Sequence, residues 1–232
     1  MPYVAAYPSA VDNATHYHAT AEAIGEFMNS DAFSTKQRII DAAEHLFASH
    51  GFAGASLRQV TSSAQVNLAA VNYHFGSKEN LINEVLRLRL DKLNADRLET
   101  LKTALAAPSL RLEDVLAAWI RPALAASAQE KGGMAFVRIL ARAYVEQSEH
   151  LRTFLHQNYG HVLRDFIAAL GRLLPTLDKQ ELYWRFDIIT GALTFAMADY
   201  GMIKRRNLGA EQYRDLTAEH LIKFAAAGLR AG

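Results

Sequence analysis

The sequence predicts an all-α protein, with a three-helix N-terminal unit followed by a larger helical region. Apolar residues recur three and four positions apart through most of the 232 residues, which is the period of an amphipathic helix. Only five prolines interrupt the chain, and runs of alternating β-branched residues are few. Two Ser-x-x-Gln patterns, at Ser34 and Ser56, match the capping box that opens a helix.

The first helix is predicted over residues 35–50. Ser34 and Gln37 supply its capping box. Gly51 closes it, because glycine enters the left-handed conformation at low cost. Its apolar stripe follows the helical spacing and consists of Ile39, Ala42, Ala43, Leu46 and Phe47.

A second, shorter helix is predicted to begin after Ser56. Gln59, three residues later, completes the capping box. Leu57, Val60 and Ala64 recur at helical spacing and form one apolar stripe.

The predicted turn is residues 65–67, and Val66 is its apolar plug. The side chain of Asn67 can accept from the first free backbone N–H groups of a third helix. In that helix Val71 and Phe75 lie four positions apart and therefore share a face. The rest of the helix is predicted to face solvent or a ligand.

Gly76 ends the third helix, and Ser77 is predicted to cap a long helix that follows. Three helices, with a three-residue turn between the second and third, make the smallest self-supporting helix-turn-helix unit. The third helix is too small and too exposed to be explained as core alone. We therefore predict a DNA-binding domain over residues 34–77, preceded by a flexible tail over residues 1–33.

The candidate DNA contacts lie on the third helix and at the helix starts around it. Tyr73 and Lys78 can donate to phosphate oxygens. Residues 68–70 form a small apolar patch that can approach thymine methyl groups, and Asn72 can read an adenine edge or hold a phosphate. The full set of candidates is Ser56, Arg58, Asn67, Leu68, Ala69, Ala70, Asn72, Tyr73, His74 and Lys78.

The segment IIDAAEHLFASHGFAGASLRQVTSSAQVNLAAVNYHFGSKENL resembles the N-terminal domain of the TetR family of bacterial repressors. The resemblance implies that the chain is a homodimer, that it binds a palindromic operator in double-stranded DNA, and that a small effector releases it. It also implies that the last two long helices form a four-helix bundle with those of a partner. Within the family, VNLAAVNYHFGSK and the later ELYWRF and GAL segments are most similar to the PsrA-type repressors, which respond to fatty acids.

The region after residue 77 is predicted to hold the effector and the dimer surface, over residues 78–232. A long helix is expected over residues 78–106, before Pro108, and Gly132 and Gly133 are expected to break the chain later on. The further helices are predicted over residues 113–128, 134–145, 151–174, 178–206 and 211–227.

Large apolar side chains in this region can line a cavity. Most of them must form an ordinary helical core, and the sequence does not assign which ones face a ligand. Arg138 and Arg142 lie four apart on an otherwise apolar helix, either as surface side chains or as anchors for an acidic head group. The candidate ligand contacts are Trp119, Phe136, Arg138, Ile139, Arg142, Phe166 and Trp184.

The effector is expected to be apolar, and the resemblance points to a long-chain fatty acid or its acyl-CoA. The alternatives are a related repressor that senses an aromatic or multidrug-type compound, and a DNA-binding protein without a ligand. An apolar cavity would argue against the last of these.

Composition and motifs weigh against several other classes. The chain has no cysteine, which fits the cytoplasm, and no apolar run approaches the length that spans a bilayer. The histidine spacings do not form a metal site, so we expect neither a metal nor a cofactor. The sequence contains no nucleophile elbow, P-loop or dinucleotide fingerprint, and we expect no enzyme. The net charge of +1 gives no evidence for nucleic acid, so phosphate binding would depend on a few placed groups.

Overall fold

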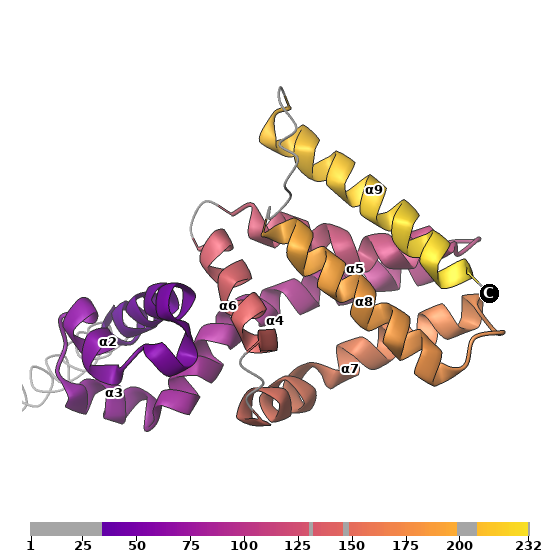
Figure 1. The fold of residues 1–232 in the computed structure, drawn as a ribbon. Helices are drawn as coiled ribbons and strands as arrows, with labels where there is room; N and C mark the ends of the chain where they lie inside the picture. Colours follow the sequence, from indigo (N-terminus) through magenta and orange to yellow (C-terminus); the bar gives the residue numbers. More distant parts are fainter. Residues whose placement is uncertain (1–33, 130–131, 146–148, 199–207, 232) are drawn as a thin grey trace, which may run out of the picture.

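The computed structural model describes residues 34–129, 132–145, 149–198 and 208–231. All regular elements in these ranges are helices, which confirms the predicted all-α class. A small helical domain lies at one end, and the long helix α4, Lys78–Leu105, runs from it into a larger helical domain (Figure 1). The tail predicted over residues 1–33 lies outside the described residues.

The small domain consists of a helix over residues 34–54 and the helices α2, Leu57–Ala64, and α3, Leu68–Phe75. Gly51 has a φ of 78°, which interrupts the first helix where the sequence predicts its end. Ser56 and Gln59 form the predicted capping box of α2. The side chain of Asn67 accepts from Ala70 N at 2.9 Å and caps α3.

The turn between α2 and α3 is fixed by the first helix. Gln65 takes the left-handed conformation, with a φ of 54°. The Arg38 guanidinium donates to the carbonyl oxygens of Ala64 and Gln65, at 2.6 and 2.7 Å. Val66 packs against the core as the predicted plug. The angle between the two helices is therefore set by backbone contacts as well as by apolar packing.

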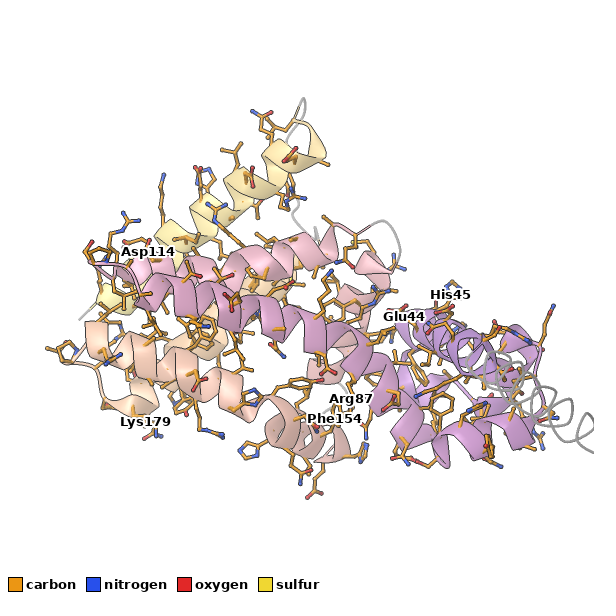
Figure 2. The ribbon with its side chains drawn as sticks, turned by 180° about the vertical axis from the view of Figure 1, so that it is seen from behind. Glu44, His45, Arg87, Asp114, Phe154 and Lys179 are labelled. Atoms are coloured by element: carbon orange, nitrogen blue, oxygen red, sulfur yellow. The ribbon has the colours of Figure 1, made fainter. Side chains whose placement is uncertain are left out.

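Helix α4 connects the two domains without a break. Ser77 caps it by accepting from Asn80 N at 3.1 Å. The bidentate ion pair of Arg89 with Glu44 links α4 to the first helix, with N–O distances of 2.9 and 3.2 Å. Figure 2 shows Glu44 at this junction, and Arg87 of α4 beside Phe154 of the larger domain. The guanidinium carbon of Arg87 lies 5.5 Å from the centre of the Phe154 ring.

In the part of the chain that the structure describes, the larger domain contains five further helices. They are α5, Leu112–Ser127; α6, Gly133–Val145; α7, Glu149–Leu173; α8, Lys179–Met197; and α9, Ala210–Arg230. Their starts and the ends of α5, α6 and α7 agree with the sequence prediction to within a few residues. Helix α8 ends at Met197, with Ala198 as its C-cap. Residues 199–207, over which the sequence predicts its continuation, lie outside the described residues.

Helix α5 forms the centre of the larger domain, in contact with α4, α7, α8 and α9. Its Trp119 ring packs against Phe166 of α7 and Phe186 of α8, with centroids 4.9 and 4.7 Å away. Tilted and edge-on aromatic pairs at this separation are favourable. No described helix is long and apolar enough to cross a membrane.

Gly133, at the start of α6, has no room for a side chain. A Cβ atom built there would lie 2.5 Å from the backbone carbonyl oxygen of Ser127. We expect Gly133→Ala to lower the free energy of unfolding by about 1–3 kcal/mol, because the backbone must shift. Gly54→Ala is the matched control, since its nearest neighbour would be His50 Cβ at 3.6 Å. Thermal unfolding of both variants measures the difference, and equal midpoints would contradict the packing of α5 on α6.

Candidate functional site

Helix α3 presents an outward face that the core does not explain. Only Val71 and Phe75 of this helix are buried, so they anchor it to the domain. Tyr73 is 83% exposed, whereas the ring of a tyrosine usually packs against neighbouring side chains. Its ring stands edge-on to His74, with centroids 5.1 Å apart. Asn72 and Ala69 share this outward surface.

The other candidate DNA contacts surround α3. Arg58 is exposed on α2, whereas Ala70 is half-buried against the core. Lys78 is half-buried in the first turn of α4. A cation at a helix N-terminus opposes the helix dipole, so Lys78 is placed against local stability. The structure leaves these residues as an exposed or half-exposed set: Ser56, Arg58, Asn67, Leu68, Ala69, Ala70, Asn72, Tyr73, His74 and Lys78.

The larger domain contains a partly open cavity of about 300 Å³ between α4, α5, α6, α7 and α8. Its walls are mainly apolar, with Leu90 and Leu93 from α4, Leu140 from α6 and Leu163 from α7. This volume lies at the lower end of the range of small-molecule sites.

Polar groups gather on part of this wall. Arg97 of α4 is buried, and its guanidinium carbon lies 3.5 Å from the centre of the Trp119 ring. Arg97 Nε donates to the Trp119 carbonyl oxygen at 3.1 Å, and Nη1 donates to Asn94 Oδ1 at 3.4 Å. Arg97, Asn94 and Trp119 all line the cavity. The cavity therefore combines an apolar body with a buried cation.

Three further ionisable side chains, those of His156, Tyr159 and Asp187, line the cavity. Tyr159 of α7 donates to Asp91 Oδ1 at 2.7 Å, and burial together with this bond raises the pKa of the Tyr159 phenol. Burial also raises the pKa of the Asp187 carboxyl on α8, although much of that residue remains exposed. Among the described residues, no group of His, Asp and Glu side chains could hold a metal ion.

Of the ligand contacts suggested by the sequence, only Trp119 lines this cavity. Phe166 packs against Trp119 within the core, while Phe136 and Ile139 are buried outside the cavity wall. Trp184 is 64% exposed on α8. Which aromatic residues line the cavity depends on how five helices pack together. The periodicity within one helix does not determine that packing.

The two arginines of α6 are not at the cavity either. Arg138 is exposed. Arg142 reaches the small domain, where Nε donates to the Ala48 carbonyl oxygen at 3.3 Å and Nη2 to that of Ser49 at 2.9 Å. Arg142 thus contacts the C-terminal part of the first helix, where a cation is favoured, and neither arginine lines this cavity.

Arg97 is the cavity residue that the sequence interpretation missed. Its position carries a signal, because it continues the buried stripe of α4 formed by Leu90, Leu93 and Leu101. An arginine in such a stripe is buried, and a buried arginine needs a polar environment.

An apolar stripe remains exposed on α8. Trp184, Ile188 and Phe195 lie four and seven positions apart, so they share one helical face. Phe224 is exposed on the adjacent helix α9. Arg185 fixes the two helices together by donating to the carbonyl oxygens of Gly228 and Ala231 at the end of α9, at 2.8 and 2.6 Å.

Two family models match the chain. Residues 39–85 match the bacterial regulatory proteins of the tetR family, and residues 117–228 match the tetracyclin repressor-like C-terminal domain. The matches therefore cover both the helix-turn-helix domain and most of the cavity domain.

Individual relatives agree with these matches. SrpR of Pseudomonas putida, an HTH-type transcriptional regulator, is 30% identical over 175 residues, which are 71% of this chain and 76% of SrpR. YttP of Bacillus subtilis, a probable regulator of the same type, is 42% identical over 53 residues, and the match spans only 23% of this chain and 26% of YttP. The crystal structure of PfmR from Thermus thermophilus has the same fold, with a TM-score of 0.56 at 18% identity over 84% of this chain and 97% of PfmR.

The Arg142 contact gives a prediction about the link between domains. Arg142→Gln removes a cation from the end of the first helix, which costs about 1–2 kcal/mol of local stability. We expect amide hydrogen exchange at residues 51–55 to become about 5- to 30-fold faster. Arg138→Gln is the matched control, because Arg138 is exposed on the same helix. Equal exchange in both variants would contradict a stabilising contact.

Proposed function

Because the chain belongs to the TetR family of transcriptional regulators, we propose that it is a dimeric repressor that binds an operator through α3. A small ligand in the cavity releases it. The outward face of α3 is the observation that carries this proposal. Tyr73, Asn72 and Ala69 are exposed on this helix, and only two of its residues are buried against the domain. Family members are regulators and not enzymes.

The chemistry around α3 suits a DNA backbone. Tyr73 supplies a hydroxyl donor and Lys78 a cation, and the N-terminus of α4 adds backbone N–H groups that favour an anion. A phosphate bound there would offset the unfavourable position of Lys78 at the helix start. Asn72 and residues 68–70 are then placed toward base edges in the major groove.

Helix α6 supports release by a ligand, because it contacts both the cavity and the small domain. Leu140 and Ala143 line the cavity, and Arg142 between them binds the first helix. A ligand that moves α6 must therefore change the contact that orients the DNA-binding domain. Such a ligand releases the operator if it binds the other conformation more tightly.

The cavity also bears on the effector class. Its presence favours a ligand-responsive repressor over a DNA-binding protein without a ligand. A compact apolar or aromatic body fits within its volume of about 300 Å³, whereas a PsrA-type long-chain fatty acid or acyl-CoA would extend out through the open side of the cavity.

A two-fold dimer follows from the size of the reading surface. One helix-turn-helix covers few base pairs, whereas two copies related by a two-fold axis read half-sites about 34 Å apart or a multiple of that. The exposed stripe on α8, together with Phe224 of α9, offers a self-complementary apolar surface for this pairing.

The DNA-binding role of α3 is tested by the double variant Tyr73→Ala, Lys78→Ala. We expect weaker binding to all sequences, and the slope of log affinity against log salt should fall by about one for each phosphate group that the variant no longer binds. Asn72→Ala, in contrast, should change the preference among operator sequences if Asn72 touches a base. Fluorescence anisotropy with labelled operator and with random DNA, at several salt concentrations, measures both effects.

The double variant should remain folded, because Tyr73 is exposed and Lys78 opposes the helix dipole. Its thermal midpoint is the control for folding. A folded double variant with unchanged operator affinity and salt dependence would contradict the assignment of α3 as the helix that binds DNA.

The dimer is tested on α8. Trp184→Glu with Ile188→Glu would bury unpaired charges in the proposed interface and should raise the dimer dissociation constant by about 100-fold or more. Leu105→Glu is the matched control, since Leu105 is an exposed apolar residue at the end of α4. Sedimentation velocity at micromolar concentration distinguishes the two states. Dimers of undiminished stability in the α8 variant would require another interface.

A further inference from the structure

The indole N–H of Trp119 lacks an acceptor. Trp119 is only 7% exposed, and its Nε1 atom has no hydrogen-bond partner among the described residues. Tryptophan N–H groups normally find a partner when they are buried, and an unsatisfied donor costs free energy. Trp119 also lines the cavity. Its Nε1 atom has less than 1 Å² of accessible surface, so an oxygen atom of a bound molecule accepts this hydrogen bond once the indole ring turns slightly toward the cavity.

A buried cation lies against the same indole. The guanidinium carbon of Arg97 is 3.5 Å from the centre of the Trp119 ring, and Arg97 Nε donates to the Trp119 backbone oxygen at 3.1 Å. These contacts hold the guanidinium on the indole ring. The Arg97 guanidinium and the Trp119 N–H, which are two kinds of hydrogen-bond donor, therefore lie in the same part of the cavity wall. Planar oxygen pairs, such as those of a carboxylate, match guanidinium geometry.

Most of the remaining wall is apolar, and Leu90, Leu140, Leu155 and Met197 belong to it. The other polar side chains on the wall are those of His156, Tyr159, Asp187, Thr190 and Thr194. The volume of about 300 Å³ lies at the lower end of the range of small-molecule sites, which suits a compact ligand.

We propose that the cavity binds a compact monocarboxylate, whose head accepts hydrogen bonds from Trp119 Nε1 and from the Arg97 guanidinium. Its aromatic or medium-chain apolar body extends along the leucine-rich wall. This inference rests on the proposed ligand-responsive function, and it names the chemical class of the effector and the residues that select its head group.

The charge distribution favours an acid over an amine. The buried guanidinium of Arg97 lies against the Trp119 ring, and a cation there disfavours a cationic head group beside the indole. The carboxylate among the described lining residues is that of Asp187, which is exposed on α8.

The first measurement is a calorimetric titration of the full chain, without DNA. The probes are 4-phenylbutyrate and decanoate, each beside the alcohol and the amine with the same carbon skeleton, together with palmitate as a larger acid. Both compact acids should bind at least about 10-fold more tightly than their alcohols, because a hydrogen bond to a charged group is worth more than one to a neutral group. Their amines and palmitate should bind more weakly still.

The second measurement observes the N–H group directly. The chain has two tryptophans, so protein labelled with ¹⁵N in the indole gives two N–H signals, and Trp184→Phe assigns them. Decanoate should move the Trp119 signal downfield, as expected when an N–H gains an anionic acceptor, while the Trp184 signal stays in place.

The variants separate the two donors. Trp119→Phe keeps an aromatic ring but removes the N–H, and Arg97→Gln removes the charge. Each should weaken decanoate binding about 10- to 100-fold while decanol binding changes less. Arg138→Gln is the matched control, because it removes an exposed arginine that does not line the cavity. If Arg97→Gln fails to fold, Trp119→Phe and the indole signal still decide the outcome.

Several results would overturn the inference: amines or alcohols that bind as tightly as the acids, no binding of either compact acid, an unmoved Trp119 signal, or full acid binding by Trp119→Phe. None of these measurements contains DNA. Failure of the operator-binding tests above would therefore refute the proposed function separately. If the acids bind but do not release the operator, the binding site is confirmed and its regulatory role is refuted.

Discussion

The continuous helix α4 is the constraint on which the rest of the structure depends. Its 28 residues belong to both domains, because Arg89 pairs with Glu44 of the first helix while Arg97, two turns further on, lines the cavity. A helix cannot bend sharply without a proline, a glycine or a disturbed hydrogen-bond ladder, and the sequence of α4 contains neither proline nor glycine. We therefore expect a displacement at the cavity end of α4 to move the DNA-binding domain with it.

Helix α6 adds a second connection that differs in kind. Its contact with the small domain includes the two hydrogen bonds that Arg142 donates to Ala48 and Ser49. Bonds of this type contribute about 0.5–2 kcal/mol, and they depend strongly on distance and angle. The rigid helix α4 sets where the domains lie, and the weaker hydrogen bonds of Arg142 can form or break without unfolding either domain.

The extent to which the sequence predicts this molecule depends on the range of each interaction. The caps at Ser56, Asn67 and Ser77 involve groups within three residues, and the outward face of α3 follows from helical spacing, so the sequence predicts all of them. Arg142, however, contacts a carbonyl 94 positions away, and an arginine on an apolar helix has the same pattern whether it meets solvent, a ligand or another helix. The aromatic residues at the cavity likewise depend on packing between helices, although the stripe of α4 does mark Arg97 as buried.

The energies of these contacts suit a switch. Allosteric coupling between two sites usually amounts to about 1–3 kcal/mol, which is comparable to the worth of the Arg142 hydrogen bonds. A ligand cannot shift the equilibrium by more than its own difference in affinity between the two conformations. A compact ligand gains that difference most effectively from a few directional contacts, such as an acceptor for the unsatisfied Trp119 N–H, because a nondirectional apolar body binds similar walls in either conformation. For the ligand-released repressor proposed above, the polar part of the cavity therefore contributes more to specificity and release than its apolar volume does.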